Sequence, residues 1–396
     1  MVGVGAVLTL GIAASASLFM AWSIGAGSSG STPFAPAVGA NAISIMRAGF
    51  IVGLLGLAGA VLQGANVTQA VGSELVIGNV LTATASIVAL LTAAALVAVG
   101  VFAGYPIATA FTVTGAVVGV GLANGGSPAI VKYQEIIALW MLTPIVGGGI
   151  AYTTARALRH EVVVEQIAIP ALAGLVGALV ANIRFAALGG ERGRSIAGAG
   201  AETIPLGADG GNLVLGSIII TMGFALISTA LVYQDMKQDT ARGQRRFLLV
   251  LGGLVAFSAG GSQVGLALGP LVPLLDVIVI PLPVVLLGGG IGLLIGSWTG
   301  APRMIKALAQ DYSSLGPRRS IAAMIPSFAI AQTAVALGIP VSFNEIIVSA
   351  IIGSGYAAGG SDVSREKMVK TVFAWISSLA LAFALSYIIF TLIDII

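Results

Sequence analysis

Charged residues gather in short clusters along this chain and leave long apolar runs between them. A helix needs about 20 apolar residues to cross the hydrocarbon core of a bilayer, so most runs can hold one crossing and the longest can hold two. The alternating segments of about ten residues that a membrane β-barrel requires are not found. The longest runs without Asp, Glu, Lys or Arg are 1–46, 48–73, 75–131, 136–155, 210–234, 247–275, 277–302, 320–344 and 371–393. This pattern predicts an all-α polytopic membrane protein with roughly 10–12 transmembrane segments.

The composition agrees with that class. Of the 396 residues, 57% are hydrophobic and only 8% are charged, whereas a soluble domain of this length carries roughly a quarter charged residues. The 55 glycines suit helices that approach one another closely within lipid. The net charge of +3 does not indicate nucleic acid, because a surplus of Lys and Arg in a membrane protein usually marks cytoplasmic loops. Lipid is the expected surrounding, and no nucleic-acid partner is expected. No Lys or Arg precedes Arg47, so 2–24 is interpreted as a first mature helix and not as a cleaved signal peptide.

Three segments of the chain occur twice at a nearly constant separation. Gly25 to Gly260 spans 235 positions, Gly104 to Gly338 spans 234, and Trp140 to Trp375 spans 235. The matched pairs are WSIGAGSS (22–29) with FSAGGSQV (257–264), GYPIATAFTVTGAVVG (104–119) with GIPVSFNEIIVSAIIG (338–353), and ALWMLTP (138–144) with FAWISSL (373–379). The repeats predict two homologous halves, 1–160 and 246–396, joined by a two-helix connector over 161–245.

Basic residues predict opposite orientations for the two halves. Loop 235–246 holds four Lys and Arg residues and is expected in the cytoplasm, which puts the connector loop 185–210 outside. Basic residues also follow 338–353, whereas the equivalent loop 121–131 of the first half has none. Both termini are then expected outside the cell, in a plasma membrane. Inverted repeats with broken or re-entrant helices are typical of secondary transporters, which bind substrate near the bilayer midplane.

A Gly- and Ser-rich stretch interrupts the first long apolar run. Irregular backbone at membrane depth is tolerated where protein or a wet cavity satisfies it, so this stretch is predicted to line a cavity. A half-helix that starts here favours an anion through its free N–H groups, and a nest of amides does the same. In the alternative interpretation, small residues only permit close helix packing. The candidate substrate-binding residues of this stretch are Gly27, Ser28, Ser29, Ser31 and Thr32.

The second half and the second pair of matched segments offer further candidates for substrate binding. Gln263 can donate to an anion oxygen, or it can bond to another helix. Ser and Thr in membrane helices often bond to their own backbone, which makes each hydroxyl weak evidence by itself. These further candidates are Gly261, Ser262, Gln263, Thr109, Thr112, Ser342 and Asn344.

Glu345 is the sharpest single candidate. It stands alone between the uncharged runs 320–344 and 346–361. A carboxylate at membrane depth is costly, and such groups face cavities and serve the movement of ions or protons. A buried carboxyl also takes up a proton more readily than one in water, so Glu345 is a candidate for proton coupling. The alternative is a position near the membrane surface.

At these residues the sequence resembles the inorganic phosphate transporter (PiT) family, and the resemblance covers both halves. That family carries a GANDVAN-type signature in each half, followed by a GLPVSTTH-type segment and a tryptophan-bearing helix. The signatures align with GAGSSGST (25–32) and GGSQVGLALGPL (260–271). The later segments align with GYPIATAF (104–111) and GIPVSFNE (338–345).

This chain departs from the family at the ionisable positions of these motifs. The family Asn and Asp fall on Gly27 and Ser28 in the first half, and on Ser262 and Gln263 in the second. The family His positions are Phe111 and Glu345. Acidic and amide groups at these positions contribute to cation and phosphate binding in the family. The resemblance extends to its sulfate permeases, whose signatures drift toward small neutral residues.

Together these features predict a secondary active transporter of inorganic phosphate that works by alternating access and is coupled to protons or sodium. The oxyanion class rests on the Gly/Ser breaks and the resemblance, and phosphate rests on the resemblance alone. A proton-coupled permease for sulfate or another tetrahedral oxyanion stays open, and a passive anion channel is less favoured. An enzyme is not expected, since the chain has one His, no Cys and no paired intramembrane carboxylates. No cofactor or metal is expected beyond the coupling ion, and the resemblance implies a homodimer.

Overall fold

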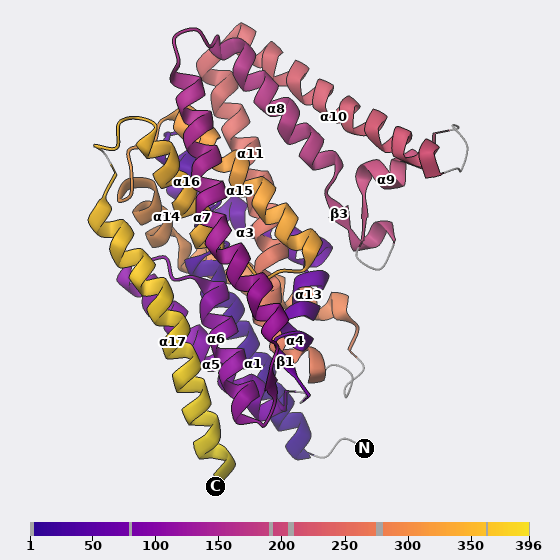
Figure 1. Cartoon of the computed structure of the whole chain (residues 1–396), viewed down its shortest axis with the longest axis vertical. Helices are drawn as coiled ribbons and strands as arrows, with labels where there is room; N and C mark the ends of the chain where they lie inside the picture. Colours follow the sequence, from indigo (N-terminus) through magenta and orange to yellow (C-terminus); the bar gives the residue numbers. More distant parts are fainter. Residues whose placement is uncertain are drawn as a thin grey trace.

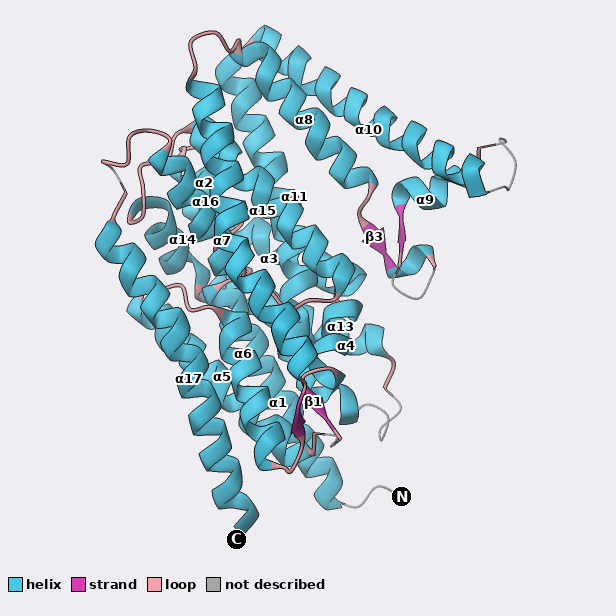
Figure 2. Ribbon diagram, viewed as in Figure 1, coloured by secondary structure: helices cyan, strands magenta, loops and turns pink. Residues whose placement is uncertain are grey.

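The protein is a bundle of long helices (Figures 1 and 2). The computed structural model describes residues 4–78, 81–189, 193–204, 210–274, 280–361 and 363–395. Within this described part, nine helices are long and apolar enough to cross a membrane. Two shorter apolar helices, Thr109–Ala123 and Glu165–Ala181, accompany them. The predicted all-α polytopic membrane protein is confirmed.

Two series of helices follow one another in a similar order along the chain. The first consists of α1 (Val4–Gly27), α2 (Ala35–Gly39), α3 (Ile45–Gln63), α4 (Ala65–Ser73), α5 (Ala83–Ala103), α6 (Thr109–Ala123) and α7 (Ile130–Arg159). The second consists of α11 (Thr240–Leu268), the 3₁₀ turn η2 (Gly269–Leu271), α13 (Leu282–Thr299), α14 (Ala301–Gln310), α15 (Pro317–Leu337), α16 (Phe343–Tyr356) and α17 (Arg365–Ile395).

The segment between the two series forms α8 (Glu165–Ala181), η1 (Ala186–Leu188), α9 (Ile196–Ala201) and α10 (Gly210–Gln238). Two short antiparallel ladders also lie in the described part of the chain. They pair β1 (Val76–Ile77) with β2 (Ser127–Pro128), and β3 (Arg184–Phe185) with β4 (Arg194–Ser195).

Helices of one series pack on helices of the other in matched pairs. Helix α6 packs on α17 and α16 packs on α7, while α1 packs on α13 and α11 packs on α3. Glycines set the close crossings. A Cβ added to Gly119 would lie 2.5 Å from the Phe383 carbonyl oxygen, and one added to Gly353 would lie 2.1 Å from that of Gly148. These reciprocal contacts favour the predicted division into two halves, which stays a prediction.

Two helical hairpins carry the expected breaks. Helix α5 ends at Gly104 and α15 ends at Gly338, where φ is +72° and +66°. Glycine adopts this left-handed conformation readily, so each helix stops there. Residues 105–108 and 339–342 then run without regular structure until α6 and α16 begin. The α5–α6 hairpin lies toward one end of the bundle and the α15–α16 hairpin toward the other (Figure 1).

The connector helices α8 and α10 lean away from the bundle, and the start of α1 and the end of α17 lie at the opposite end (Figure 1). Residues 235–246, which the sequence places in a cytoplasmic loop, are helical except at Asp239, because α10 runs to Gln238 and α11 starts at Thr240. Their side of the membrane stays a prediction. Asp239 makes this tight turn possible, since its carboxylate accepts from the amides of Ala241 and Arg242 at 3.0 and 3.1 Å. In the expected loop 185–210, residues 190–192 and 205–209 lie outside the described part.

Candidate functional site

The first Gly/Ser stretch lies where α1 ends. The amides of Ser28 and Ser29 donate to the Ile24 carbonyl at 2.8 and 3.1 Å, and those of Ser31 and Thr32 donate to the Ser28 carbonyl at 3.0 Å. No half-helix therefore starts within 28–32, so the free N–H groups that would favour an anion there are not available. The stretch closes the C-terminal end of α1, and these four amides are used within its own turns.

The second Gly/Ser stretch is not unwound. Helix α11 runs without a break from Thr240 to Leu268 and includes Gly261, Ser262 and Gln263. The two matched segments therefore differ in structure, and the sequence contains a physical reason. Leu266, Ala267 and Leu268 are good helix formers and the next proline comes only at Pro270, whereas the first stretch combines four hydroxyl residues with Pro33.

Gln263 joins three elements at the centre of the candidate site. Its Oε1 accepts from the Thr109 hydroxyl at 2.7 Å and from the Ser28 hydroxyl at 3.3 Å. Its Nε2 donates to the Val341 carbonyl at 2.7 Å. One side chain of α11 thus connects the end of α1, the start of α6 and the extended segment before α16. The two signature stretches, 25–32 and 260–271, therefore meet at the contact between Ser28 and Gln263.

Asn344 makes a second bridge between the same elements. Its Nδ2 donates to the Gly27 carbonyl at 2.9 Å and to the Ile107 carbonyl at 2.6 Å. These two acceptors fix the orientation of the amide group. Asn344 Oδ1 then faces no hydrogen-bond partner among the described residues, although the residue is fully buried. A buried acceptor without a donor is costly, so this atom is suited to a ligand that brings a donor.

Two helix N-termini point to this cluster. Helix α6 begins at Thr109, and α16 begins after Ser342, whose hydroxyl accepts from the Glu345 amide at 3.4 Å. A helix N-terminus favours an anion through its free N–H groups and its dipole. Both helices start within the second pair of matched segments, 104–119 and 338–353.

Several candidate hydroxyls bond only to nearby backbone. Thr112 donates to the Ala108 carbonyl at 3.0 Å, and Ser262 donates to that of Ala259 at 3.3 Å. Ser31 and Thr32 both donate to the Ser28 carbonyl, at 3.1 and 3.0 Å. These bonds fit the local alternative that the sequence left open. The candidates are nevertheless all buried: Ser28, Ser29, Ser31, Thr32, Thr109, Thr112, Ser262, Gln263, Ser342 and Asn344.

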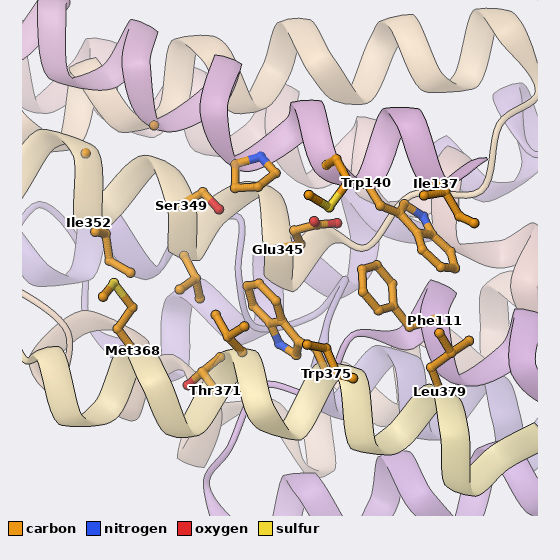
Figure 3. A pocket seen from close by; sticks show the side chains of 17 residues that line it. Phe111, Ile137, Trp140, Glu345, Ser349, Ile352, Met368, Thr371, Trp375 and Leu379 are labelled. Atoms are coloured by element: carbon orange, nitrogen blue, oxygen red, sulfur yellow. The ribbon is translucent and has the colours of Figure 1, made fainter. Parts of the chain in front are cut away.

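Glu345 faces a cavity of about 540 Å³ between α7, α16 and α17 (Figure 3). The residue is 2% exposed, and its Oε2 has no hydrogen-bond partner in the described part of the chain. The carboxyl points into the space between the Trp140 and Trp375 rings (Figure 3). It therefore sits inside the protein, as the functional interpretation of the sequence requires.

Aromatic side chains that the sequence analysis used only as markers of the repeat or of family positions also belong to the site. Trp140 Nε1 donates to the Pro340 carbonyl at 3.2 Å, and Trp375 Nε1 donates to the Pro106 carbonyl at 2.7 Å. Phe111 stacks on Trp140 with ring centroids 3.8 Å apart. The constant offset between the two tryptophans is the signal that could have revealed this reciprocal role.

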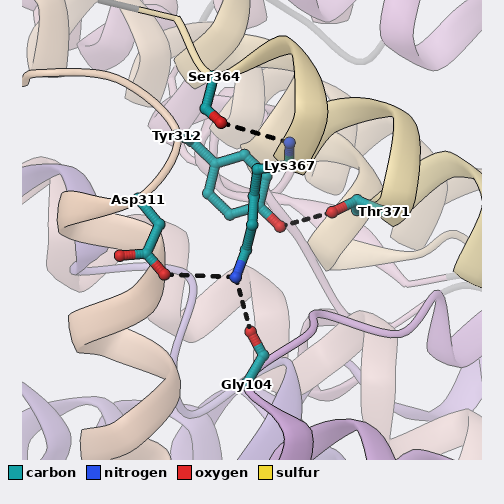
Figure 4. A network of polar contacts seen from close by, with 6 residues as sticks. All are labelled: Gly104, Asp311, Tyr312, Ser364, Lys367 and Thr371. Carbon is teal, nitrogen blue, oxygen red and sulfur yellow. Dashed lines mark hydrogen bonds and ion pairs between the residues drawn. The ribbon is translucent and has the colours of Figure 1, made fainter.

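Polar contacts tie α17 to the α5–α6 hairpin near the cavity (Figure 4). Lys367 Nζ lies 3.3 Å from Asp311 Oδ2, 3.4 Å from the Gly104 carbonyl and 4.3 Å from the centroid of the Tyr105 ring (Figure 4). Tyr312 shares a hydrogen bond of 2.7 Å with Thr371 (Figure 4). Burial raises the pKa of the Tyr312 phenol, so it stays neutral.

The comparison with known protein families decides the identity of the chain. The model of the phosphate transporter family matches residues 24–386. The chain belongs to the phosphate transporter family. A Pyrococcus abyssi protein, named as a candidate phosphate permease, is 26% identical over 95% of this chain and 96% of its own. The chloroplastic inorganic phosphate transporter 2-1 of Arabidopsis thaliana is 26% identical over 93% of this chain and 70% of its own.

A solved structure of a sodium-dependent phosphate transporter has the same fold. It aligns with a TM-score of 0.79 and 22% sequence identity over 98% of this chain and 100% of its own. Among the described residues, no group of three or more His, Asp or Glu side chains is placed to hold a metal ion. The family and the solved structure agree with the polytopic helical fold. The polar cluster around Gln263 and Asn344 is the candidate substrate site of this protein.

Proposed function

We propose that this chain carries inorganic phosphate across a plasma membrane by alternating access and that a proton moves with the phosphate. The site lies between α1, α6, α11 and α16, where the two predicted halves meet. Termini on the outside, which the basic residues predict, belong to the same proposal. So do a coupling ion and a homodimer, which the family resemblance implies. Its support comes from the family and from the chemistry of the buried polar cluster.

One observation carries the choice of phosphate over sulfate. Asn344 Oδ1 is a buried acceptor without a partner, next to the N-terminus of α16. At neutral pH phosphate still carries at least one proton, whereas sulfate carries none. A protonated phosphate can accept from helix amides and hydroxyls and at the same time donate to Asn344 Oδ1. Sulfate has only acceptors and leaves that atom unsatisfied, which costs binding free energy.

Glu345 is the proposed carrier of the coupled proton. It follows Asn344 directly, and it is buried with an unpartnered carboxyl oxygen. Desolvation penalises a charged carboxylate at Glu345, and a negative charge there also disfavours a bound anion. Protonation of Glu345 and binding of phosphate therefore favour one another. Sodium stays the alternative coupling ion that the family suggests.

Uptake by proteoliposomes tests this function. Vesicles that contain the purified protein should accumulate labelled phosphate when the outside is more acidic than the inside, and protein-free vesicles should not. Arsenate, which also keeps a proton at neutral pH, should compete well, whereas sulfate and selenate should compete poorly. A sodium gradient of the same size, imposed without a pH gradient, identifies the coupling ion. No accumulation under either gradient, or equal competition by sulfate and arsenate, would contradict the proposal.

A further inference from the structure

The cavity at Glu345 has a chemical character of its own. It lies between α7, α16 and α17, with Phe111 of α6 at one wall (Figure 3). Its volume of about 540 Å³ falls in the range of ligand pockets, roughly 300–1,000 Å³. Its described lining is almost wholly apolar and includes no Lys, Arg or His. An anion finds no positive partner here, so this cavity is distinct from the phosphate site proposed above.

Among the described residues that line the cavity, Glu345 alone has an acidic side chain. Glu345 is 2% exposed, and its Oε2 has no partner among the described residues. Thr371, which also lines the cavity, shares its hydroxyl with Tyr312 at 2.7 Å. Ser349 lies one helical turn after Glu345 and offers only a hydroxyl. An ammonium group is the complement that this unpartnered carboxyl lacks.

Two indole rings reinforce the preference for a cation. Both Trp140 and Trp375 use their Nε1–H groups on proline carbonyls, at 3.2 and 2.7 Å, so the ring faces are the surface that they still offer. Phe111 covers one face of Trp140 and leaves the other. A cation over an aromatic face is attracted by the ring, most strongly by tryptophan. Glu345 lies between these two rings (Figure 3). The three side chains together make a cage that suits an organic cation.

The cavity borders the surface that lipid covers. Met141 and Ile137 of α7 are 66% and 54% exposed, and Ile376 of α17 is 60% exposed, while all three line the cavity. Both helices are long and apolar enough to cross a membrane. A ligand with an apolar body can therefore reach the carboxyl from the bilayer without crossing the polar cluster.

We propose that this cavity binds a lipophilic organic cation, an ammonium group on an aliphatic or aromatic body, which enters from the bilayer and pairs with Glu345. An acyl chain fills the apolar part of the cavity but leaves the carboxyl unpartnered, and so does an apolar helix of a second copy. The site is independent of what the protein transports. If the proposed function also holds, the bound cation blocks transport because it occupies the proton-carrying group.

Quenching of tryptophan fluorescence tests binding without any measurement of transport. The protein has four tryptophans, and Trp22→Phe with Trp298→Phe leaves Trp140 and Trp375 as reporters. In phosphatidylcholine vesicles, a bromoalkylamine should quench them saturably. A bromoalkyl alcohol of equal chain length should need an at least about tenfold higher concentration, since a hydrogen bond to a charged group is stronger than one to a neutral group.

Variants at Glu345 separate pairing from simple partition into lipid. In Glu345→Gln, the amine should quench tryptophan fluorescence at the same concentrations as the alcohol. In Glu345→Asp, most of the difference in concentration between amine and alcohol should remain. The matched control is Glu366→Gln on α17, which removes an acidic side chain that is 78% exposed, and it should change nothing.

Two outcomes would overturn the site. Equal quenching by the amine and the alcohol in the protein that retains Glu345 would mean that the cavity binds a neutral alkyl chain. An amine advantage that survives Glu345→Gln would mean that the cation binds elsewhere. If Glu345→Gln does not fold, the amine-to-alcohol ratio with Glu345 in place still decides the matter, and Glu366→Gln remains its control.

Discussion

Trp140 and Trp375 hold reciprocal positions in this protein. Each indole donates its Nε1–H to a proline carbonyl in the extended segment of the other predicted half, Trp140 to Pro340 at 3.2 Å and Trp375 to Pro106 at 2.7 Å. These extended segments lead directly into α6 and α16, whose N-termini face the polar cluster. Any relative movement of the two halves must therefore either break these two hydrogen bonds or move each extended segment together with the tryptophan that bonds to it.

Replacement of Gln263 by leucine should disable the polar cluster. The hydroxyls of Ser28 and Thr109 would lose their common acceptor, and the Val341 carbonyl would lose its donor. We expect phosphate uptake in proteoliposomes to fall at least about tenfold, because several buried polar groups are left unpaired. Gln69→Leu on the exposed face of α4 is the matched control and should transport normally. Uptake by Gln263→Leu within twofold of the control would remove this residue from the site.

Replacement of Asn344 should alter the choice between anions. Asn344→Leu removes the orphan acceptor together with the donor to Gly27 and Ile107. We expect the affinity for phosphate to fall more than the affinity for sulfate. The inhibition constant of sulfate divided by that of phosphate should therefore drop about tenfold. Competition of unlabelled sulfate against labelled phosphate measures this ratio.

Asn344→Asp serves as the comparison for selectivity. Aspartate keeps acceptor oxygens and should retain a preference for arsenate and phosphate over sulfate, even if its overall rate is low. If Asn344→Leu transports phosphate with unchanged selectivity, another group distinguishes the anions.

Glu345→Gln should uncouple uptake from pH. A proton that enters with phosphate makes uptake faster when the outside is more acidic than the inside. Glutamine cannot take up this proton, so the ratio of uptake with and without a pH gradient should fall to about one, whereas Glu345→Asp should keep a ratio above one. Glu366→Gln, an exposed acid on α17, is the control. A full response to the gradient in Glu345→Gln would exclude this carboxyl as the proton carrier.

Gly353→Ala should separate α16 from α7. The added methyl group would lie 2.1 Å from the Gly148 carbonyl oxygen, and the backbone there cannot move cheaply. We expect a loss of roughly 1–3 kcal/mol in the free energy of unfolding, with a lower melting temperature in detergent. Gly149→Ala adds the same methyl group to α7 where nothing lies within 4 Å, and it should be neutral or slightly stabilising. Equal melting temperatures for both variants would show that this crossing tolerates a wider spacing.

The distribution of charges was enough to predict the helical membrane fold, because long uncharged runs have few other stable forms. The hairpin breaks could also be predicted, since Gly104 and Gly338 each precede a proline-containing extended segment. Whether 260–263 is helical or unwound could not be predicted from the sequence, because glycine and serine permit a break in a helix without enforcing one. Helix α11 uses them for close packing instead, and Gly260 lies against the Gly56 carbonyl.

The role of Gln263 could be predicted only in part. The sequence marked it as a candidate but left open whether it binds an anion or another helix. In the structure it bonds to Ser28, Thr109 and Val341, which come from three separate elements. No periodicity or spacing in the sequence contains such long-range contacts. The cavity at Glu345 was out of reach for the same reason, since α7, α16 and α17 together form it.

The crossing of α6 by α17 also limits how the protein can be made. On the ribosome, α6 is complete long before α17 emerges. The surface of α6 that later packs on α17 is therefore exposed to the translocon or to lipid in the meantime. Trp140 likewise waits for Pro340. A nascent chain released before α17 is made would have its first series of helices inserted, but α6 would lack its partner helix. Membrane quality control should degrade such a chain.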